Sequence, residues 1–313
     1  MEVEAKRPTG KILIAFAVIY LVFGTTYLAI RVGVREVPPL LLAAMRFLTA
    51  GAVMYGWLML RGERSPKARQ WAAASLLGFM IFVCDYGLLF WAEKRVPSGI
   101  AAVMMATIPA FIALAEIVLL RTQRLTVRLA AALLIGMAGV AVLMSRSLHL
   151  GDAPIDTLGA VALIFASVSW SLSTVLTRKL PLPESKPMSA ATQMLTGGVM
   201  LVIAAGVAGD FRGFRPAAVS LGAWAALVYL IVAGSIVGFT AYVWLLHHES
   251  PTKVGTYAYV NPVVAVLVGY FLGGEALGLR TVLGTVAVLI SVVLITRTGT
   301  RKPVQAAMAK TGR

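Results

Sequence analysis

The segment FGTTYLAIR at residues 23–31 has a counterpart, WSLSTVLTR at 170–178, and both end in arginine. At the same offset of 147 residues, AAMRFLTAG at 43–51 aligns with AATQMLTGG at 190–198. The identities are few, but they keep their order along the chain. The second half of the sequence therefore repeats the first.

Later landmarks extend the repeat at a slightly larger offset. Trp91 pairs with Trp244, and Pro109 pairs with Pro262, both at an offset of 153 residues. The change of offset requires only short insertions in loops. The repeat divides the chain near residue 150.

Apolar runs of membrane-spanning length fill most of the chain. Apolar residues make up 59% of the 313 residues, charged residues only 13%, and the mean hydropathy is +0.86. A hydrocarbon core needs roughly 20 apolar residues per helix, and continuous apolar runs favour helices over a barrel. Ten spans are expected, at 11–31, 38–60, 70–92, 97–120, 127–145, 157–177, 188–208, 219–246, 253–272 and 279–297.

Each repeat thus holds five spans, and an odd number forces the two copies into opposite orientations across the bilayer. The expected fold is an all-α integral membrane protein with ten transmembrane helices in two inverted five-helix repeats. The repeats are 1–150 and 151–313, the second with a short cytoplasmic tail. Many secondary transporters use inverted repeats to expose one midplane site to each side in turn.

The net charge of +15 follows the predicted topology. Nineteen of the 28 Lys and Arg residues lie on the side that carries both termini, and eight lie on the other side. This is the positive-inside bias, and it places both termini in the cytoplasm. The basic charge is therefore explained by membrane orientation and does not indicate a nucleic-acid partner.

Signals for enzymatic chemistry are missing from the sequence. It has no HExxH, Walker A or GxSxG motif, and its three histidines lie at span ends or in loops. The single cysteine, Cys84, excludes an internal disulfide. No catalytic residue, metal site or cofactor is expected. The expected partners are a small-molecule substrate and the lipid bilayer, and the chain is expected as a monomer or homodimer.

Apart from the two outermost residues at each end of a predicted span, three charged residues lie within the spans: Arg46, Asp85 and Glu116. A charge near the bilayer centre costs at least about 2.5 kcal/mol unless it is paired or hydrated. Arg46 and Asp85 lie at similar depth, about two helical turns below the outer surface. They are expected to contact one another or a shared water-filled cavity, as a structural pair or as a coupling group. Glu116 lies near the cytoplasmic interface and is expected simply to reach it.

Aromatic residues away from the span ends suggest a cavity with apolar walls and a few hydroxyls, which suits amphipathic solutes. Tyr20, Phe23 and Tyr27 recur on one face of the span 11–31. Packing is the alternative role for such a stripe. The candidate substrate-binding residues are Tyr20, Phe23, Tyr27, Asp85, Tyr86, Met104, Pro109, Trp170, Phe239, Tyr242, Tyr257 and Asn261.

Pro109 and Pro262 are expected near the middle of their spans, where proline removes a backbone hydrogen bond and kinks the helix. The freed carbonyl needs a partner, which favours a position facing protein or a cavity. A packing kink is the alternative. Asn261 precedes Pro262, and its carboxamide would bond either a neighbouring helix or a substrate.

The sequence resembles the EamA-type ten-helix branch of the drug/metabolite transporter superfamily along its whole length. The motifs that carry the resemblance are GTTY at 24–27, Arg46–Phe47, and the helices of Pro109 and Asn261–Pro262. Each of these last two helices is followed by a short link and a final Gly/Ala-rich helix. The acidic residue typical of the link is kept as Glu275 but replaced by Gln123 in the first half.

The resemblance implies a transporter in the bacterial cell inner membrane that exports small metabolites such as amino acids, nucleosides or drug-like compounds. Among these, the aromatic residues and the few polar groups favour amino acids, with aromatic or large apolar ones leading. Nucleosides or drug-like compounds are the alternative substrates. A non-transporting membrane scaffold is the alternative of a different class. The poorly polar spans 127–145 and 279–297 are expected at the periphery, with Ala132 and Gly136 spaced for close helix contact.

Overall fold

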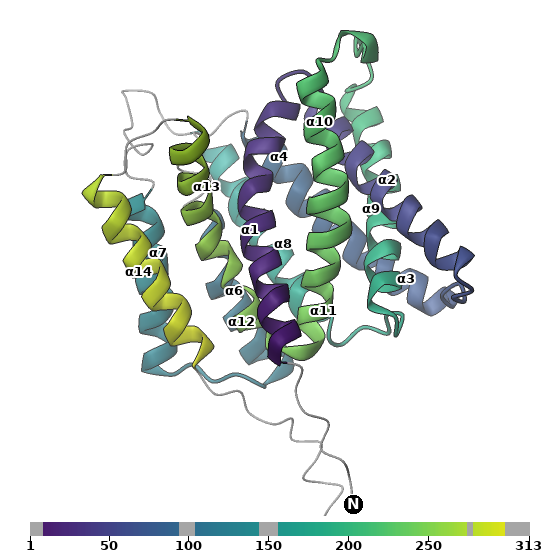
Figure 1. Ribbon diagram of the computed structural model, residues 1–313. Coiled ribbons are helices and arrows are strands. Elements are labelled where there is room, and N and C mark those ends of the chain that lie inside the picture. Colours follow the sequence, from purple (N-terminus) through teal and green to yellow (C-terminus); the bar gives the residue numbers. More distant parts are fainter. Residues whose placement is uncertain (1–8, 94–103, 144–155, 274–277, 298–313) are drawn as a thin grey trace, which may run out of the picture.

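A computed structural model describes residues 9–93, 104–143, 156–273 and 278–297, and within them the chain is helical with no strand (Figure 1). Seven helices are long and apolar enough to cross a membrane. Shorter apolar helices account for the other three predicted spans, so the arrangement has ten spans as expected. The predicted boundary near residue 150 lies outside the described residues.

The first half begins with two long helices, after which the third span joins three segments into one helix over Ala68–Ala92. The elements of this half are α1 (Thr9–Gly33), α2 (Pro39–Leu60), α3 (Ala68–Gly78), the π-helical segment η1 (Phe79–Gly87), α4 (Leu88–Glu93), α6 (Ile108–Ala115), the π-helical segment η2 (Glu116–Leu120) and α7 (Val127–Leu143).

The second half follows the same plan, and its third span is again one long helix, over Leu221–His248. The elements of this half are α8 (Thr157–Leu176), α9 (Lys186–Ala208), the 3₁₀ turn η3 (Pro216–Ala218), α10 (Leu221–Tyr229), the π-helical segment η4 (Leu230–Phe239), α11 (Thr240–His248), α12 (Pro251–Val254), α13 (Tyr257–Gly273) and α14 (Leu279–Thr296).

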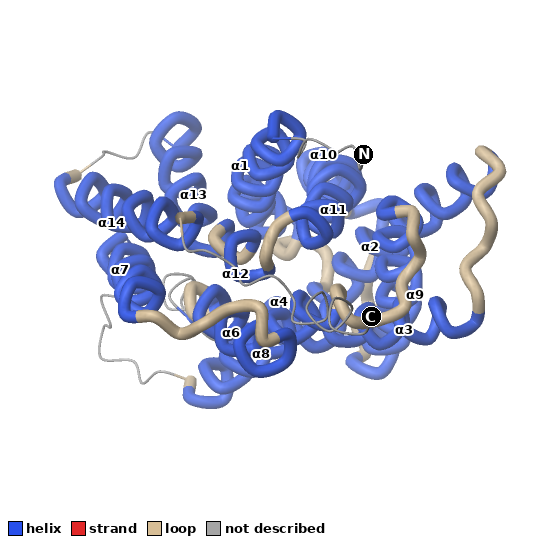
Figure 2. The backbone as a smooth tube through the Cα atoms, turned by 90° about the horizontal axis from the view of Figure 1, so that it is seen from below, coloured by secondary structure: helices blue, strands red, loops and turns tan. Residues whose placement is uncertain are grey.

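Helices at equivalent positions of the two repeats pack against each other at both ends of the bundle. Figure 2 shows α2 beside α9 at one end and α7 beside α14 at the other, and these two pairs make the most extensive helix contacts. In the space between, α1 packs on α13 just as its repeat counterpart α8 packs on α6. This exchange of equivalent partners is what two inverted repeats produce.

Glycines make the contact between α2 and α9 close, and they do so symmetrically. A Cβ added to Gly198 would lie 2.5 Å from the backbone nitrogen of Leu48, and one added to Gly51 would collide with the backbone of Leu195. Gly51 and Gly198 are repeat equivalents at the offset of 147, as are Leu48 and Leu195. Small residues let membrane helices approach this closely. In lipid the hydrophobic effect does not drive helices together, so the van der Waals contacts made at this short distance hold the pair together instead.

Small residues also make the contact between α7 and α14 close. A Cβ on Gly139 would lie 3.0 Å from the carbonyl oxygen of Gly284, and the hydroxyl of Ser291 donates to the carbonyl of Ala132 at 2.6 Å. Gly136 faces Ser291 in this contact. The close contact predicted at Ala132 and Gly136 is thus made within the fold.

Two spans differ from the expected continuous helices. The ninth span, predicted at 253–272, is interrupted at Gly255 and Thr256. There the Thr256 hydroxyl donates to the Lys253 carbonyl at 2.7 Å. The span predicted at 97–120 turns at Ala106 and Thr107 before α6 begins. At both breaks some backbone N–H and C=O groups lose their helical hydrogen-bond partners, and neighbouring hydroxyl groups bond to part of these backbone groups.

The third span of each repeat contains a π-helical segment at an equivalent place, η1 in one and η4 in the other. Such segments widen the helix and are frequent at functional sites. In η1, the freed Met80 carbonyl accepts a hydrogen bond from the Ser169 hydroxyl of α8 at 2.8 Å. The two widened segments lie in the middle of the bundle, beside α8 and α1 respectively.

The turn after α1 is tied to the start of α10 by one carboxylate. Glu36 accepts hydrogen bonds from the backbone N–H and the hydroxyl of Ser220, both at 2.6 Å. These two bonds hold the pKa of the Glu36 carboxyl below its usual value. Ser220 also caps α10 by accepting from the Ala223 N–H at 3.2 Å.

We expect this tie to make stability depend on pH in the acidic range. Because the folded pKa of Glu36 is lowered, its stabilisation is fully present above the unfolded pKa of about 4.3 and is lost as pH falls through the folded value. Between about pH 5 and pH 3 the Tm of the native protein should therefore fall more than that of Glu36→Gln. Thermal unfolding in detergent measures this, with the exposed Glu184→Gln as control. Equal slopes for native protein and Glu36→Gln would contradict it.

Candidate functional site

Nine aromatic rings form one connected cluster in the middle of the bundle, with neighbouring centroids 4.4–6.2 Å apart. Elements from both repeats contribute, including both π-helical segments. The rings of this central cluster are Phe23, Phe47, Phe82, Tyr86, Phe90, Trp170, Phe239, Tyr242 and Tyr257.

Six of the predicted aromatic residues belong to the central cluster, and two do not. The ring of Tyr20 contacts Phe16 at 5.6 Å, and its hydroxyl bonds the Thr256 hydroxyl at 2.7 Å, at the break before α13. Tyr27 is half-buried and interacts electrostatically with Tyr257 of the cluster. Sequence reasoning did not include Phe47, Phe82 and Phe90, because nothing local separates them from ordinary packing residues.

Trp170 occupies the middle of the cluster, where it contacts Tyr86, Tyr242 and Tyr257. Its side chain is 3% exposed, and its indole Nε1 has no hydrogen-bond partner. Trp170 therefore does not face lipid. An unpaired buried donor is uncommon in proteins and calls for an explanation.

The hydroxyl of Tyr242 is oriented by α8. The Thr174 hydroxyl gives its single proton to the Trp170 carbonyl at 2.7 Å, so it must accept from Tyr242 at 2.5 Å. The proton of the Tyr242 hydroxyl is therefore used in this bond, and its oxygen interacts with the Trp170 side chain. Neighbouring hydroxyls of α8 are likewise engaged, with Ser171 donating to the Ile108 and Ser167 carbonyls.

Asp85 lies in η1, next to Tyr86, and is 2% exposed. Its carboxylate interacts electrostatically with Tyr86, Tyr242 and Tyr257. The Oδ1 atom has no hydrogen-bond partner. The structure thus buries a carboxylate with an unpaired oxygen beside Tyr86, within electrostatic range of two further tyrosines of the central cluster.

Arg46 lies in α2 on a different side of the cluster and is 1% exposed. Its Nε donates to the Ser235 hydroxyl at 2.9 Å, while its guanidinium carbon lies 4.5 Å from the Phe47 ring centroid and 5.5 Å from that of Tyr86. A Cβ on Gly234 would lie 2.8 Å from Nη2, so the absence of a side chain there makes room for the guanidinium. Nη1 has no partner.

The predicted direct contact between Arg46 and Asp85 is wrong. Both residues are described, and no ion pair or hydrogen bond joins them; instead each borders Tyr86. The matching depth stays a prediction, and the two side chains have different neighbours. A shared cavity between them stays a prediction.

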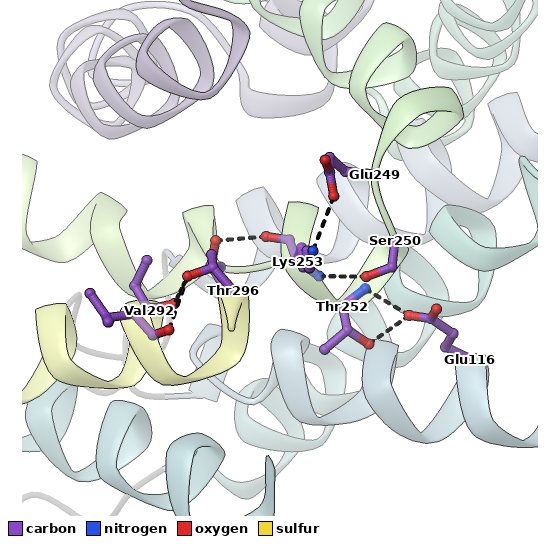
Figure 3. Close-up of polar contacts among 9 residues, drawn as sticks. Glu116, Glu249, Ser250, Thr252, Lys253, Val292 and Thr296 are labelled. Carbon is purple, nitrogen blue, oxygen red and sulfur yellow. Dashed lines mark hydrogen bonds and ion pairs between the residues drawn. The ribbon is translucent and has the colours of Figure 1, made fainter. Parts of the chain in front are cut away.

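Glu116 is fully buried, which corrects the expectation that it reaches the interface. Its carboxylate accepts from the Thr252 backbone N–H at 2.9 Å and from the Thr252 hydroxyl at 2.7 Å (Figure 3). It also accepts from the Thr122 hydroxyl at 2.8 Å. It therefore joins the end of α6 and η2 to the start of α12, across the two repeats. A surface ion pair between Lys253 and Glu249, at 3.3 Å, lies beside it.

The remaining predicted site residues are placed along the fourth and ninth spans. Pro109 lies in the first turn of α6 and not in mid-helix, so its missing N–H costs no helical bond. Pro262 does lie inside α13. Asn261 before it is 3% exposed with an unpartnered Oδ1, and Met104 is half-buried.

Comparison with known proteins assigns the family. The sequence pattern of the EamA-like transporter family matches residues 10–145 and, a second time, residues 157–297. The chain belongs to this family. The EamA-like transporter accordingly has one copy of the family unit in each of its halves.

Relatives of this EamA-like transporter carry transporter names. It is 37% identical over 284 residues to "Uncharacterized inner membrane transporter YedA" of Escherichia coli K12, covering 90% of this chain and 89% of that protein. It is 26% identical over 276 residues to "Protein PecM" of Dickeya dadantii, covering 88% of each. A solved crystal structure 23% identical in sequence matches with a TM-score of 0.73 over 92% of this chain and 97% of that one, which supports the fold.

The EamA-like transporter is therefore a membrane transporter that acts on a small-molecule substrate in a lipid environment. The family assignment points to a transporter and not to an enzyme. The central cluster lies between the two copies of the family unit and receives side chains from both.

Proposed function

We propose that the protein exports amino acids, with aromatic or large apolar ones favoured, across the bacterial inner membrane by alternating access, with both termini in the cytoplasm. The observation that carries this proposal is the central cluster bordered by two unpaired charges of opposite sign. Arg46 and Asp85 each border Tyr86 without contacting one another. An amino acid offers a carboxylate, an ammonium and a side chain that match such surroundings.

The apolar walls favour amino acids over strongly charged metabolites. The rings of Trp170, Tyr242 and Phe239 supply large apolar area and selected polar edges. A phosphorylated sugar would need several buried cations, and among the described residues Arg46 is the fully buried one. Nucleosides would also stack on the rings, but they would not use the two opposite charges.

Alternating access is supported by hydrogen bonds at the end of the bundle where α12 lies (Figure 1). There Glu116 binds Thr252 in α12, and Tyr20 binds Thr256 at the break before α13. Both bonds join one repeat to the other, and we take them to hold this end closed. Because the repeats are inverted, the opposite end can close by an equivalent movement.

The test is solute flux in proteoliposomes that contain only this protein. We expect saturable counterflow of radiolabelled phenylalanine or leucine, competed by other large apolar amino acids. Liposomes without protein are the control for leakage. Saturable flux of a nucleoside with no response to amino acids would establish the alternative substrate class. A folded protein that moves none of these solutes would favour a scaffold.

A further inference from the structure

We infer that the structure contains a site for a positively charged amino group, formed by Asp85 with the rings of Tyr86, Trp170, Tyr242 and Tyr257. We call these five residues the amine site. The inference deepens the proposed function and rests on it, since it names the chemical group by which the transported solute is held.

The first argument is the state of the carboxylate. Asp85 is 2% exposed, its Oδ1 has no partner, and Arg46 does not pair with it. A buried carboxylate without a cation is costly in a protein interior and more so in a membrane. A ligand that brings a positive charge to Asp85 would remove that cost each time it binds.

The second argument is the nature of the surrounding rings. Trp170 contacts the three tyrosines at centroid distances of 5.3–6.2 Å, and the Asp85 carboxylate, next to Tyr86 in η1, interacts electrostatically with all three. Ring faces carry negative partial charge and attract ammonium groups, with the interaction strongest for tryptophan and in desolvated sites. Rings and carboxylate therefore favour the same sign of ligand charge.

The third argument is the direction of the hydrogen bonds. Thr174 has given its proton to the Trp170 carbonyl, so Tyr242 must donate to Thr174 and has no proton left for a ligand. The carboxylate of Asp85 is an acceptor. An ammonium group has three donors and no acceptor, which complements a carboxylate beside a hydroxyl whose proton is already used.

Arg46 borders the amine site at the ring of Tyr86, 5.5 Å from its centroid, but its Nε donates to Ser235 and it does not pair with Asp85. A carboxylate on the same solute would meet Arg46, but that contact is separate from the amine site. In the present conformation the rings pack directly on one another. Binding therefore requires the Trp170 ring of α8 to move away from Tyr86 of η1 or Tyr257 of α13, as alternating access would allow.

The distinguishing experiment compares three probes that share one phenyl ring and differ in charge. Phenylalanine carries both charges, 2-phenylethylamine carries only the amine, and 3-phenylpropionate carries only the carboxylate. Binding to the purified full-length protein is measured by the shift in Tm and by quenching of tryptophan fluorescence. We expect phenylalanine and 2-phenylethylamine to bind, and 3-phenylpropionate to bind at least about tenfold more weakly than either.

The matched variant is Asp85→Asn, which keeps the shape of the side chain and removes its charge. It should weaken binding of both amines at least about tenfold. Its Tm without ligand should be no lower than that of the native protein, because an uncompensated buried charge is gone. Glu249→Gln, which changes a carboxylate of a surface ion pair, should bind all three probes as the native protein does.

The outcomes separate this inference from the proposed function. Flux of phenylalanine that does not respond to Asp85→Asn would overturn the amine site and leave amino-acid export standing. Binding of 2-phenylethylamine that depends on Asp85, without flux of any amino acid, would support the amine site and reject amino-acid export. Tighter binding of 3-phenylpropionate than of 2-phenylethylamine, or no binding of any probe, would overturn the amine site directly.

Discussion

Gly51→Val should prevent α2 and α9 from packing and lower the yield of folded protein more than any other single change considered for this chain. The added side chain would collide with the backbone of Leu195, and a helix backbone cannot move aside as a side chain can. Overpacking ordinarily costs about 1–3 kcal/mol and sometimes more. We expect the loss of stability to reach or exceed the upper end of this range. It should appear as a lower Tm and as aggregation in detergent.

The same helix provides the control. Gly56 has open space where its Cβ would be, so Gly56→Val should leave yield and Tm nearly unchanged. Gly198→Val, at the equivalent position of the other repeat, should match Gly51→Val because it meets the backbone of Leu48. A similar Tm for Gly51→Val and Gly56→Val would show that the two helices do not pack as described.

The second large effect is expected from Glu116→Ala. Its carboxylate serves three donors, and removing it leaves the Thr252 N–H and hydroxyl buried without a partner. Hydrogen bonds to charged groups contribute about 1.5–3 kcal/mol each, so a loss of about 3 kcal/mol or more is expected. Flux should also fall, because α12 would lose the hydrogen bonds that connect it to the residue following α6.

Two further variants give this prediction its controls. Glu116→Gln retains an oxygen that can accept from Thr252, so its Tm should lie between those of native protein and Glu116→Ala. Glu249→Ala removes a partly exposed ion pair with Lys253, which is worth about 0–1 kcal/mol. A Tm for Glu116→Ala as high as that for Glu249→Ala would mean that the buried link contributes little.

Sequence analysis predicted the aromatic part of the candidate site better than its charged part. Trp170, Tyr242 and Tyr257 could be singled out because aromatic residues deep in a span stand apart from those at the interfaces. Phe82 and Phe90 could not, since their role depends on which rings other helices bring next to them. The substrate-binding roles predicted for Trp170, Tyr242 and Tyr257 remain predictions.

The charged residues show why depth alone is insufficient. Counting residues from the span ends placed Arg46 and Asp85 at one level, because the rise per residue of a helix is constant. Whether they meet depends on how each helix is rotated about its own axis, and packing decides that. The contacts of Arg46 with Ser235 and of Glu116 with Thr252 both cross between repeats, and no local pattern reports them.

The sequence by itself determined the number of spans, the repeat and the family, because the length of an apolar run and the order of landmarks are properties of the chain alone. Only the tertiary structure decided which polar groups inside the bundle are satisfied. It placed the break at Gly255 and Thr256, widened η1 and η4, and left Asp85 without a cation among tyrosines. The physical reason is that a buried polar group is stabilised or left unpaired by neighbours distant in sequence, and packing alone selects those neighbours.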